Sequence, residues 1–431
     1  MSKTIYSKLV NRRGMKDSLP SLDYGEFGFC GDTDQIFAGI KSNEELILAA
    51  KSKTVTVGSE GDYPTINAAL ESLSRKKAIH NTGAVTVRLL SGFIMEEQVK
   101  ITTNLSWVVI ESAAAEVVVR RSALTVAPGR NNPSMYPAFF VTDGGISPLI
   151  NVLFSMDSSG AATGRYGFYV EGSGHLSIAP DKGCKGAPRG LWVCGAGVSA
   201  DCDSGIFTGS AEYGITARHG GRINANYANV SNSGRGIGSY SGASIACRDI
   251  NAQNCTVSAV VAVTSGKIYA RFANASGSAI GGFAAGNAIF NAPDFIAENC
   301  TGRGLFGHTA GYISASRAQL ANCDTGMYIE NGSWVSANSS DVTNCTMGAL
   351  IRRGSHAHLR ESDFSGCTTG IEARHASIVD AHLCNMNNTG VGFRTTHGAW
   401  ISATDVTTVG STTPFDVGAT NSLHPDGWVV N

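Results

Sequence analysis

Acidic side chains recur at a constant spacing in the C-terminal half of the chain. Asp341 and Asp363 are 22 residues apart, and Glu361 lies two residues before Asp363. If 22 residues make one turn of a regular β fold, Asp341 and Asp363 lie ~4.8 Å apart, close to the ~5.5 Å separation of a retaining glycosidase pair. Repulsion between two such carboxylates raises the pKa of one and leaves a general acid. We therefore predict Asp341, Asp363 and Glu361 as catalytic candidates, with a solvated rim as the alternative.

A second column at the same spacing is mostly basic. Its predicted members are His308, Glu330, Arg352, Arg374 and Arg394, with Arg218 and His219 at the same place farther up. In a polysaccharide lyase, arginine neutralises a uronate carboxylate and a neighbouring base removes a proton from the sugar. A groove that only binds acidic sugars has the same composition. The column predicts binding of acidic polysaccharide, and lyase chemistry or an inert surface are the alternatives.

Both columns depend on an internal repeat. Glycines mark the same point of successive repeats at a spacing of 22 residues: Gly304, Gly326, Gly348 and Gly370. The series continues at Gly390, and related glycines extend it upstream over about residues 165–410. Inside each repeat apolar residues alternate with polar ones, which is the period of a strand with one buried face. Leucine-rich and helical repeats need patterns that are absent. The sequence predicts an all-β, right-handed parallel β-helix with ~22-residue coils.

The cysteines and the composition narrow the function. The 11 cysteines show no CxxC or zinc-ligand spacing, so we expect reduced, packed thiols and neither a metal nor a cofactor. A net charge of −1 argues against nucleic-acid binding. No apolar run reaches the ~18 residues of a membrane span, and the first residues lack the apolar core of a secretory signal. We expect synthesis in a cytoplasm, without membrane insertion.

The segment before the repeats has its own motif. Residues 61–66 read Gly-Asp-Tyr-Pro-Thr-Ile, and an amphipathic helix follows whose apolar face is Ile66, Ala69, Leu70 and Leu73, with Asp62 as the predicted N-cap. Strands are predicted around residues 55–57, 85–89, 97–101 and 107–110. This segment resembles the opening of pectin-lyase-like β-helices. The resemblance implies a helix that covers the open end of the solenoid, where strand edges and core would otherwise be exposed.

Residues 12–39 carry a different pattern. Arg12-Arg13-Gly14 leads through Leu19-Pro20 to a stretch with Gly25-Glu26, Asp32-Thr33 and Ile36-Phe37. The pattern resembles the short N-terminal module of bacteriophage tailspikes and tail fibres. It predicts two strands, 26–29 and 35–37, across a polar turn, followed by a linker over 40–53.

The two resemblances imply a domain order and a function. The predicted division is a virion-attachment arm (1–50), a capping helix with first coils (51–125), irregular coils (126–165), β-helix repeats (166–410) and a C-terminal cap (411–431). By resemblance to tailspikes, the protein is a homotrimer of the virion tail that holds phage tail or baseplate proteins through its arm. The β-helix then recognises bacterial surface polysaccharide (capsule or lipopolysaccharide), and many such spikes also cut it. The alternatives are a free bacterial polysaccharide lyase or epimerase, and a structural fibre or adhesin without activity.

Overall fold

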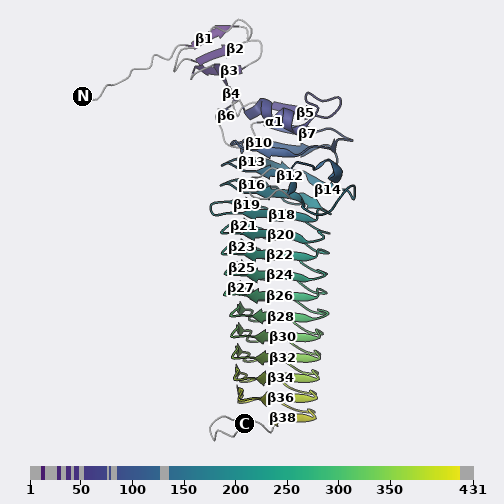
Figure 1. Cartoon of the computed structure of the whole chain (residues 1–431), viewed down its shortest axis with the longest axis vertical. Coiled ribbons are helices and arrows are strands. Elements are labelled where there is room, and N and C mark those ends of the chain that lie inside the picture. Colours follow the sequence, from purple (N-terminus) through teal and green to yellow (C-terminus); the bar gives the residue numbers. More distant parts are fainter. Residues whose placement is uncertain are drawn as a thin grey trace, which may run out of the picture.

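The protein is described as a computed structural model. It covers the backbone of residues 11–14, 27–30, 35–39, 43–47, 53–74, 77–78, 85–126 and 135–417, with side chains for 53–74, 85–126 and 135–416. The predicted right-handed parallel β-helix is confirmed: the coils stack along one axis, and each strand pairs in parallel with its counterpart in the next coil (Figure 1).

One long face of the β-helix is a sheet of 14 parallel strands. In chain order, which is also their order in the sheet, these strands are β9 (Val99–Ile101), β12 (Tyr136–Val141), β15 (Arg165–Val170), β18 (Arg189–Cys194), β20 (Tyr213–Arg218), β22 (Arg235–Tyr240), β24 (Ser258–Val263), β26 (Ile280–Ala285), β28 (Arg303–His308), β30 (Thr325–Glu330), β32 (Met347–Arg352), β34 (Thr369–Arg374), β36 (Val391–Thr396) and β38 (Thr413–Val417). Most of these strands are six residues long, which gives this face three outward side chains a coil.

A second face has 15 mostly shorter parallel strands. They are β5 (Lys53–Val57), β7 (Val85–Leu89), β10 (Val108–Ser112), β13 (Ile146–Asn151), β16 (His175–Ile178), β19 (Ser199–Asp201), β21 (Arg222–Asn224), β23 (Ser244–Ala246), β25 (Lys267–Tyr269), β27 (Ile289–Asn291), β29 (Tyr312–Ser314), β31 (Trp334–Ser336), β33 (His356–His358), β35 (Ile378–Asp380) and β37 (Trp400–Ser402). A third face starts as a four-stranded sheet of β8 (Ile94–Met95), β11 (Val117–Val119), β14 (Leu153–Met156) and β17 (Gly183–Lys185). It continues as single parallel bridges from Gly183 to Thr407.

The interior is filled by the alternate residues of these strands. Ile313 pairs with Val335, and both are fully buried. The cysteines behave as small core residues: Cys345 donates its thiol to the carbonyl of Leu320 at 3.3 Å, and Cys367 donates to Val342 at 3.1 Å. The cysteines whose side chains are described are all free thiols, and Cys194 alone among them is partly exposed. These cysteines therefore contribute to the fold as small buried apolar residues and not through disulfides.

The register corrects one step of the predicted repeat. Ile371 pairs with Phe393, so Gly392 and not Gly390 follows Gly370. A Cβ on Gly370 would lie 2.6 Å from the carbonyl oxygen of Gly392, and this close approach of neighbouring coils explains the recurring glycine. Coil length also varies, because Leu191, Ile215 and Ile237 pair in turn across coils of 24 and 22 residues. The turns, rather than the strands, absorb the extra residues.

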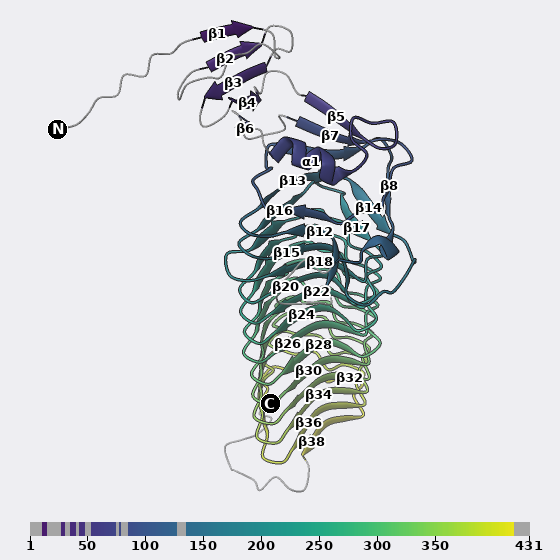
Figure 2. The same cartoon turned by 45° about the horizontal axis from the view of Figure 1, so that its top comes forward.

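Helix α1 (Ile66–Ser74) lies across the N-terminal end of the β-helix (Figure 2). Its buried face is Ile66, Ala69, Leu70 and Leu73, which confirms the predicted face. The predicted cap was wrong: the N-cap is Thr65, whose hydroxyl accepts a hydrogen bond from the amide of Ala68 at 3.1 Å. Asp62 lies too early in the chain and instead accepts hydrogen bonds from the amide and hydroxyl of Thr56.

The predicted arm strands are present. β2 (Phe27–Cys30) pairs antiparallel with β3 (Gln35–Gly39), as the sequence predicts. They belong to a five-stranded sheet with β1 (Asn11–Gly14), β4 (Asn43–Ile47) and β6 (Lys77–Ala78). β4 lies inside the predicted linker, and β6 follows α1, so the sheet joins the arm to the capping segment.

The predicted irregular coils and C-terminal cap are described in part. Residues 136–156 supply one strand to each face, namely β12, β13 and β14, and a short 3-10 helix, η2 (Arg121–Ala123), precedes them. Of the predicted cap, residues 418–431 lie outside the described part of the chain.

Candidate functional site

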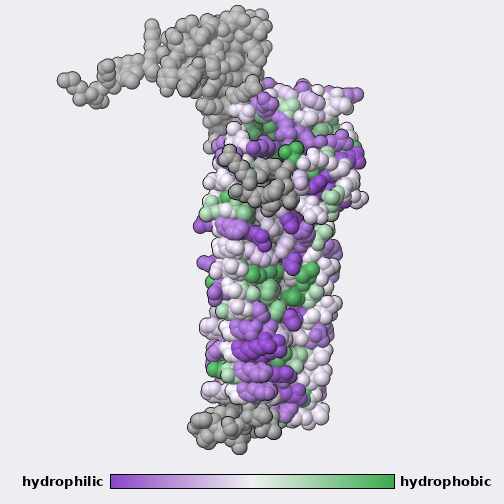
Figure 3. Space-filling model, in the orientation of Figure 1, coloured by the Kyte–Doolittle hydropathy of each residue, from purple (hydrophilic) through white to green (hydrophobic). Residues whose placement is uncertain are grey.

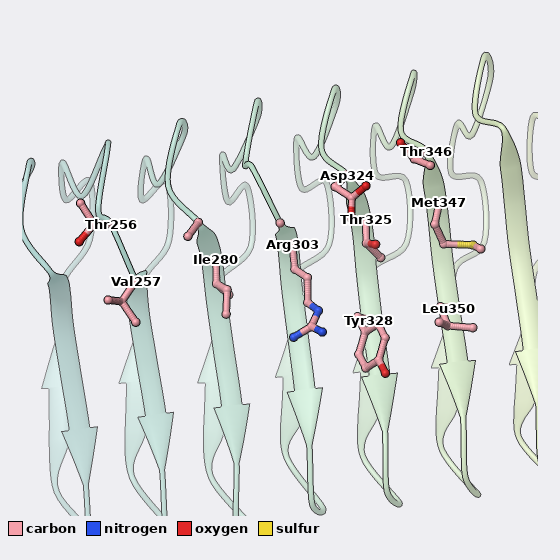
Figure 4. A pocket seen from close by; sticks show the side chains of 12 residues that line it. Thr256, Val257, Ile280, Arg303, Asp324, Thr325, Tyr328, Thr346, Met347 and Leu350 are labelled. Atoms are coloured by element: carbon pink, nitrogen blue, oxygen red, sulfur yellow. The ribbon is translucent and has the colours of Figure 1, made fainter.

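A groove runs along the outer side of the 14-stranded sheet. It has a volume of about 680 Å³ and crosses five coils, from Val257 near β24 to Leu350 in β32. Figure 4 shows its lining side chains projecting from successive strands and from the turns that precede them. Five coils at ~4.8 Å span ~19 Å, so the groove lies parallel to the axis of the β-helix.

Aromatic side chains form the floor beside and within this groove. Phe283, Phe306 and Tyr328 occupy the same outward position of β26, β28 and β30. The ring centroids of Phe283 and Phe306 are 4.9 Å apart and stacked, and those of Phe306 and Tyr328 are 5.4 Å apart and edge-on. Each ring is half-buried. The arrangement leaves aromatic surface available to an apolar or ring-shaped ligand.

Two arginines lie over these rings: Arg352, whose Cζ is 4.9 Å from the ring centroid of Tyr328, and Arg303, which lines the groove. Arg303, the first residue of β28, has its Cζ 4.2 Å from the ring centroid of Phe306 and 4.2 Å from that of Tyr328. The rim of the groove carries polar groups from the turns and strand starts: Thr256, Asp324, Thr325 and Thr346. The lining of the groove thus combines the aromatic ring of Tyr328, one cation, one carboxylate and several hydroxyl groups.

The predicted basic column is real but its charges are paired. Glu330 is only 7% exposed and faces Arg352 in the next strand. Its carboxylate lies 2.7 Å from the guanidinium of Arg352, 3.2 Å from that of Arg353 and 3.7 Å from the ring of His308. Arg374 follows Arg352 in the ladder. Glu330 therefore serves as the shared counter-ion of this column.

One predicted member, Arg394, lies elsewhere, and Arg218 lies in the row but far from the rest. Arg394 does not follow Arg374, because Thr396 does; Arg394 lies in the neighbouring row, opposite Glu372, and pairs with Asp416 at 2.8 Å. The misplacement follows from taking Gly390 as the repeat glycine. Arg218 is in the predicted row, but Tyr240, Val263 and Ala285 separate it from His308.

The surroundings of Arg218 and His219 differ from those of the column. The Arg218 guanidinium lies between the rings of Trp192 and Tyr240, at 4.9 and 4.8 Å. His219 Nδ1 lies 3.3 Å from Cys194 Sγ. The structure thus does not bring Arg218 and His219 together with the residues around Glu330.

The sequence analysis missed Glu372, an acid in the outward row of Tyr328 and Leu350. Its side chain is 1% exposed, Oε1 accepts a hydrogen bond from Arg374, and Oε2 has no partner among the described residues. The Arg374 pKa is raised chiefly by this hydrogen bond. The two-residue spacing of Glu372 and Arg374 on one strand face is the signal that could have found it.

Two of the predicted catalytic acids, Asp341 and Asp363, lie on the third face, and Glu361 lies in the turn that precedes it. Asp341 and Asp363 are paired in adjacent coils, as the spacing predicts. Each accepts a hydrogen bond from the amide two residues on, from Thr343 at 3.0 Å and from Ser365 at 2.9 Å. Asn385, one coil later, makes the same hydrogen bond to Asn387. Asp341 and Asp363 therefore also stabilise the turns that follow them.

Glu361 lies in a turn with a positive φ of 59° and accepts a hydrogen bond from the Ser339 hydroxyl at 3.0 Å. It is exposed, as is Asp341, and none of the three acids lines the groove. The groove and the predicted acids are separate features of the surface.

Hydropathy divides the face that carries the groove. In Figure 3 an apolar area crosses the middle of the molecule at the level of β24–β28, and a polar area lies below it, at the level of β30–β36. The turns after β32, β34 and β36 carry Arg353, His375 and His397. The imidazoles of His375 and His397 stack with centroids 4.5 Å apart, and desolvation followed by the nearby His397 and Arg353 lowers the pKa of His375.

Comparison with known proteins does not identify a function for the chain, so the function is inferred from the site. No protein-family model matches the chain, and no curated protein is significantly similar to it. The parallel β-helix fold is shared by proteins that bind or degrade polysaccharides, tailspikes among them. Within the described residues no helix is long and apolar enough to span a membrane. The same residues contain no cluster of three or more acidic, histidine or cysteine side chains arranged to hold a metal ion.

Proposed function

We propose that the protein binds an extended polysaccharide lengthwise in the groove of the 14-stranded sheet. The observation that carries this proposal is the aromatic floor: the partly exposed ring of Tyr328 lines a groove that crosses five coils, and the ring of Phe306 packs edge-on beside it. A sugar ring has apolar C–H faces that pack on aromatic rings and hydroxyl groups that hydrogen-bond to a polar rim. A linear chain fits a groove that repeats with the coils.

At a finer level, we propose that the protein is a bacteriophage tailspike or tail fibre of the virion. The arm pattern at residues 12–39 and the β-helix support this reading together. In this proposal the arm holds a phage tail or baseplate protein, and the groove recognises capsule or lipopolysaccharide of the host.

We further propose that three copies assemble side by side. The support is a stripe of outward residues along the 15-stranded sheet: Ile289, Tyr312, Trp334, His356, Ile378 and Trp400. Trp334, Ile378 and Trp400 are each more than 40% exposed. Strands β27–β37 present no lysine or arginine outward and one carboxylate, Asp380, which pairs with Arg360 at 2.7 Å. An uncharged aromatic stripe parallel to the axis can meet its own copy without like-charge repulsion.

Cleavage of the bound chain is the second candidate function. The observation that favours it is Glu372, a buried carboxylate with one unpartnered oxygen in the same row as the groove residue Leu350. Arg374 holds this carboxylate in its ionised form, and its free oxygen is suited to accept a proton as a general base.

The experiment is incubation of the full chain with capsular polysaccharides and lipopolysaccharides from a bacterial panel. We measure retention, chain length and absorbance of unsaturated uronate. Retention without shortening is expected for a receptor-binding spike. Shortening with new absorbance would identify a lyase, and shortening without it a hydrolase. If no chain is retained, the proposal is wrong and a structural fibre takes its place.

A further inference from the structure

Most arginines near the groove have an acidic partner. Arg352 and Arg353 share Glu330, Arg374 pairs with Glu372, and Arg394 pairs with Asp416. Each guanidinium in this set has its charge compensated within the protein. Arg352, Arg353 and Arg374 are poorly placed to exchange that partner for a ligand, because Glu330 or Glu372 would be left buried and unpaired.

Arg303 differs from all of them. Its backbone amide donates to the carbonyl of Ala279, but among the described residues its guanidinium has no hydrogen bond and no ion pair and lies only over the rings of Phe306 and Tyr328. Asp324 lines the same groove, but Figure 4 shows it at the beginning of β30, while Arg303 extends toward the level of the Tyr328 ring. The neighbours of Arg303 in its own row are Ile280 and Thr325, which carry no charge.

An arginine in this setting is a recognition group. Its five N–H donors form a planar fork that fits a carboxylate, sulfate or phosphate through two parallel hydrogen bonds. Stacking on two rings holds the guanidinium plane in place, so little side-chain freedom is lost when an anion binds. The half-buried, apolar walls also strengthen a charge-assisted hydrogen bond relative to one in water.

We propose that Arg303 binds the acidic group of the polysaccharide, so that the ligand is an anionic chain with its acidic group above Phe306 and Tyr328. This inference rests on the proposed function of the groove and names the chemical class of its ligand. It also moves the anion site from the basic column around Glu330, whose charges are compensated, to the middle of the groove.

The test compares wild type, Arg303→Gln and Arg303→Lys on the chains that the panel retains. Each chain is used in its native form, after carboxyl reduction and after desulfation, which separates carboxylate from sulfate as the recognised group. We expect the retained chains to be acidic and to lose binding when their acidic group is removed. Arg303→Gln is expected to weaken binding roughly 10- to 100-fold, the loss typical of a charge-assisted hydrogen bond. Arg303→Lys is expected to keep the preference for the acidic form at lower affinity.

The matched control is Arg317→Gln, which removes an arginine that pairs with Asp294 at 2.6 Å and does not line the groove. It is expected to bind as wild type does. Retained chains that are neutral, or equal binding by wild type and Arg303→Gln, would overturn the inference. If such chains still depend on Tyr328, the groove binds polysaccharide and only the role of Arg303 is wrong. If no chain is retained, both proposals fail.

Discussion

At the scale of single residues, carboxylates at outward positions of neighbouring coils have different roles. Asp341 and Asp363 hold turns, Glu330 neutralises arginines, and Glu372 is buried with a free oxygen. All four lie on outward positions of adjacent coils, so their sequence spacing alone does not separate these roles. Hydrogen-bond partners do, and they make the roles testable.

The turn role of Asp341 and Asp363 predicts that asparagine can replace both. Asn385 makes the same hydrogen bond one coil later, so Asp341→Asn with Asp363→Asn is expected to change the free energy of unfolding by less than ~0.5 kcal/mol. Thermal unfolding measures this. If the pair is also catalytic, as its spacing predicts, the double variant keeps its fold and no longer shortens a cleaved polysaccharide. Equal shortening by variant and wild type would contradict that catalytic prediction.

Because Glu330 is the shared counter-ion of Arg352 and Arg353, removing its charge is expected to lower the free energy of unfolding. Glu330→Gln leaves Arg352 and Arg353 without their shared partner, and we expect unfolding to become easier by about 1–3 kcal/mol. Chemical denaturation measures the difference. Glu298→Gln, which changes a partly exposed acid without such partners among the described residues, serves as the control. Equal stability of the two variants would show that the ion pairs of Glu330 do not contribute to the stability of the fold.

At the scale of elements, the capping helix depends on a residue outside it. Glu97 accepts hydrogen bonds from the amides of Ile66 and Asn67, at 2.6 and 3.0 Å, and so closes the first turn of α1. Burial raises the Glu97 pKa above its ordinary value, although these hydrogen bonds oppose the shift. Glu97 therefore links the helix to the first coils of the β-helix.

This arrangement predicts a stability loss of about 1–3 kcal/mol for Glu97→Ala, because two helix amides and the Asn67 side chain lose their acceptor. The neighbouring variant Glu96→Ala removes an exposed ion pair to Arg120 at 3.3 Å and is expected to cost less than ~1 kcal/mol. Melting temperatures of the two variants measure the difference, and the larger decrease is expected for Glu97→Ala. A similar shift for both would contradict the capping role.

The sequence predicts much of these elements, and its failures are specific. Alternation and the glycine column are enough for the β-helix, and the apolar spacing of Ile66, Ala69, Leu70 and Leu73 is enough for the capping face. The position of Arg394 fails because Gly390 and Gly392 are both glycines, and only backbone pairing shows which one approaches Gly370.

The site was harder to predict for a physical reason. A search for columns of like charge finds the residues around Glu330, whose charges compensate each other. The neighbours of Arg303 in the two adjacent coils, Ile280 and Thr325, are uncharged, so such a search passes over it. The available signal was an arginine three residues before Phe306 with Tyr328 one coil later. The role of Arg303 becomes apparent only from the structure, which shows that its guanidinium has no acidic partner among the described residues.

At the scale of the whole molecule, the proposed assembly predicts an oligomer that depends on the stripe containing Trp334 and Trp400. Wild type is expected to sediment as three chains of 44.9 kDa. Trp334→Lys with Trp400→Lys places like charges at the proposed contact and is expected to shift the protein toward the monomer. Tyr227→Lys, at a side chain 54% exposed elsewhere, is the control. An unchanged sedimentation coefficient in the double variant would place the contact on another face.

The central claim is that the groove on the 14-stranded sheet binds polysaccharide, and one paired measurement tests it most directly. Equilibrium binding of a retained polysaccharide is compared for wild type, Tyr328→Ala and Tyr269→Ala. Tyr328 lines the groove, whereas Tyr269 is an exposed tyrosine on the 15-stranded sheet. The account predicts that Tyr328→Ala weakens binding at least ~5-fold, from the loss of ring stacking worth about 1 kcal/mol or more, while Tyr269→Ala binds as wild type does. Equal affinity of all three proteins, or a loss confined to Tyr269→Ala, would contradict it.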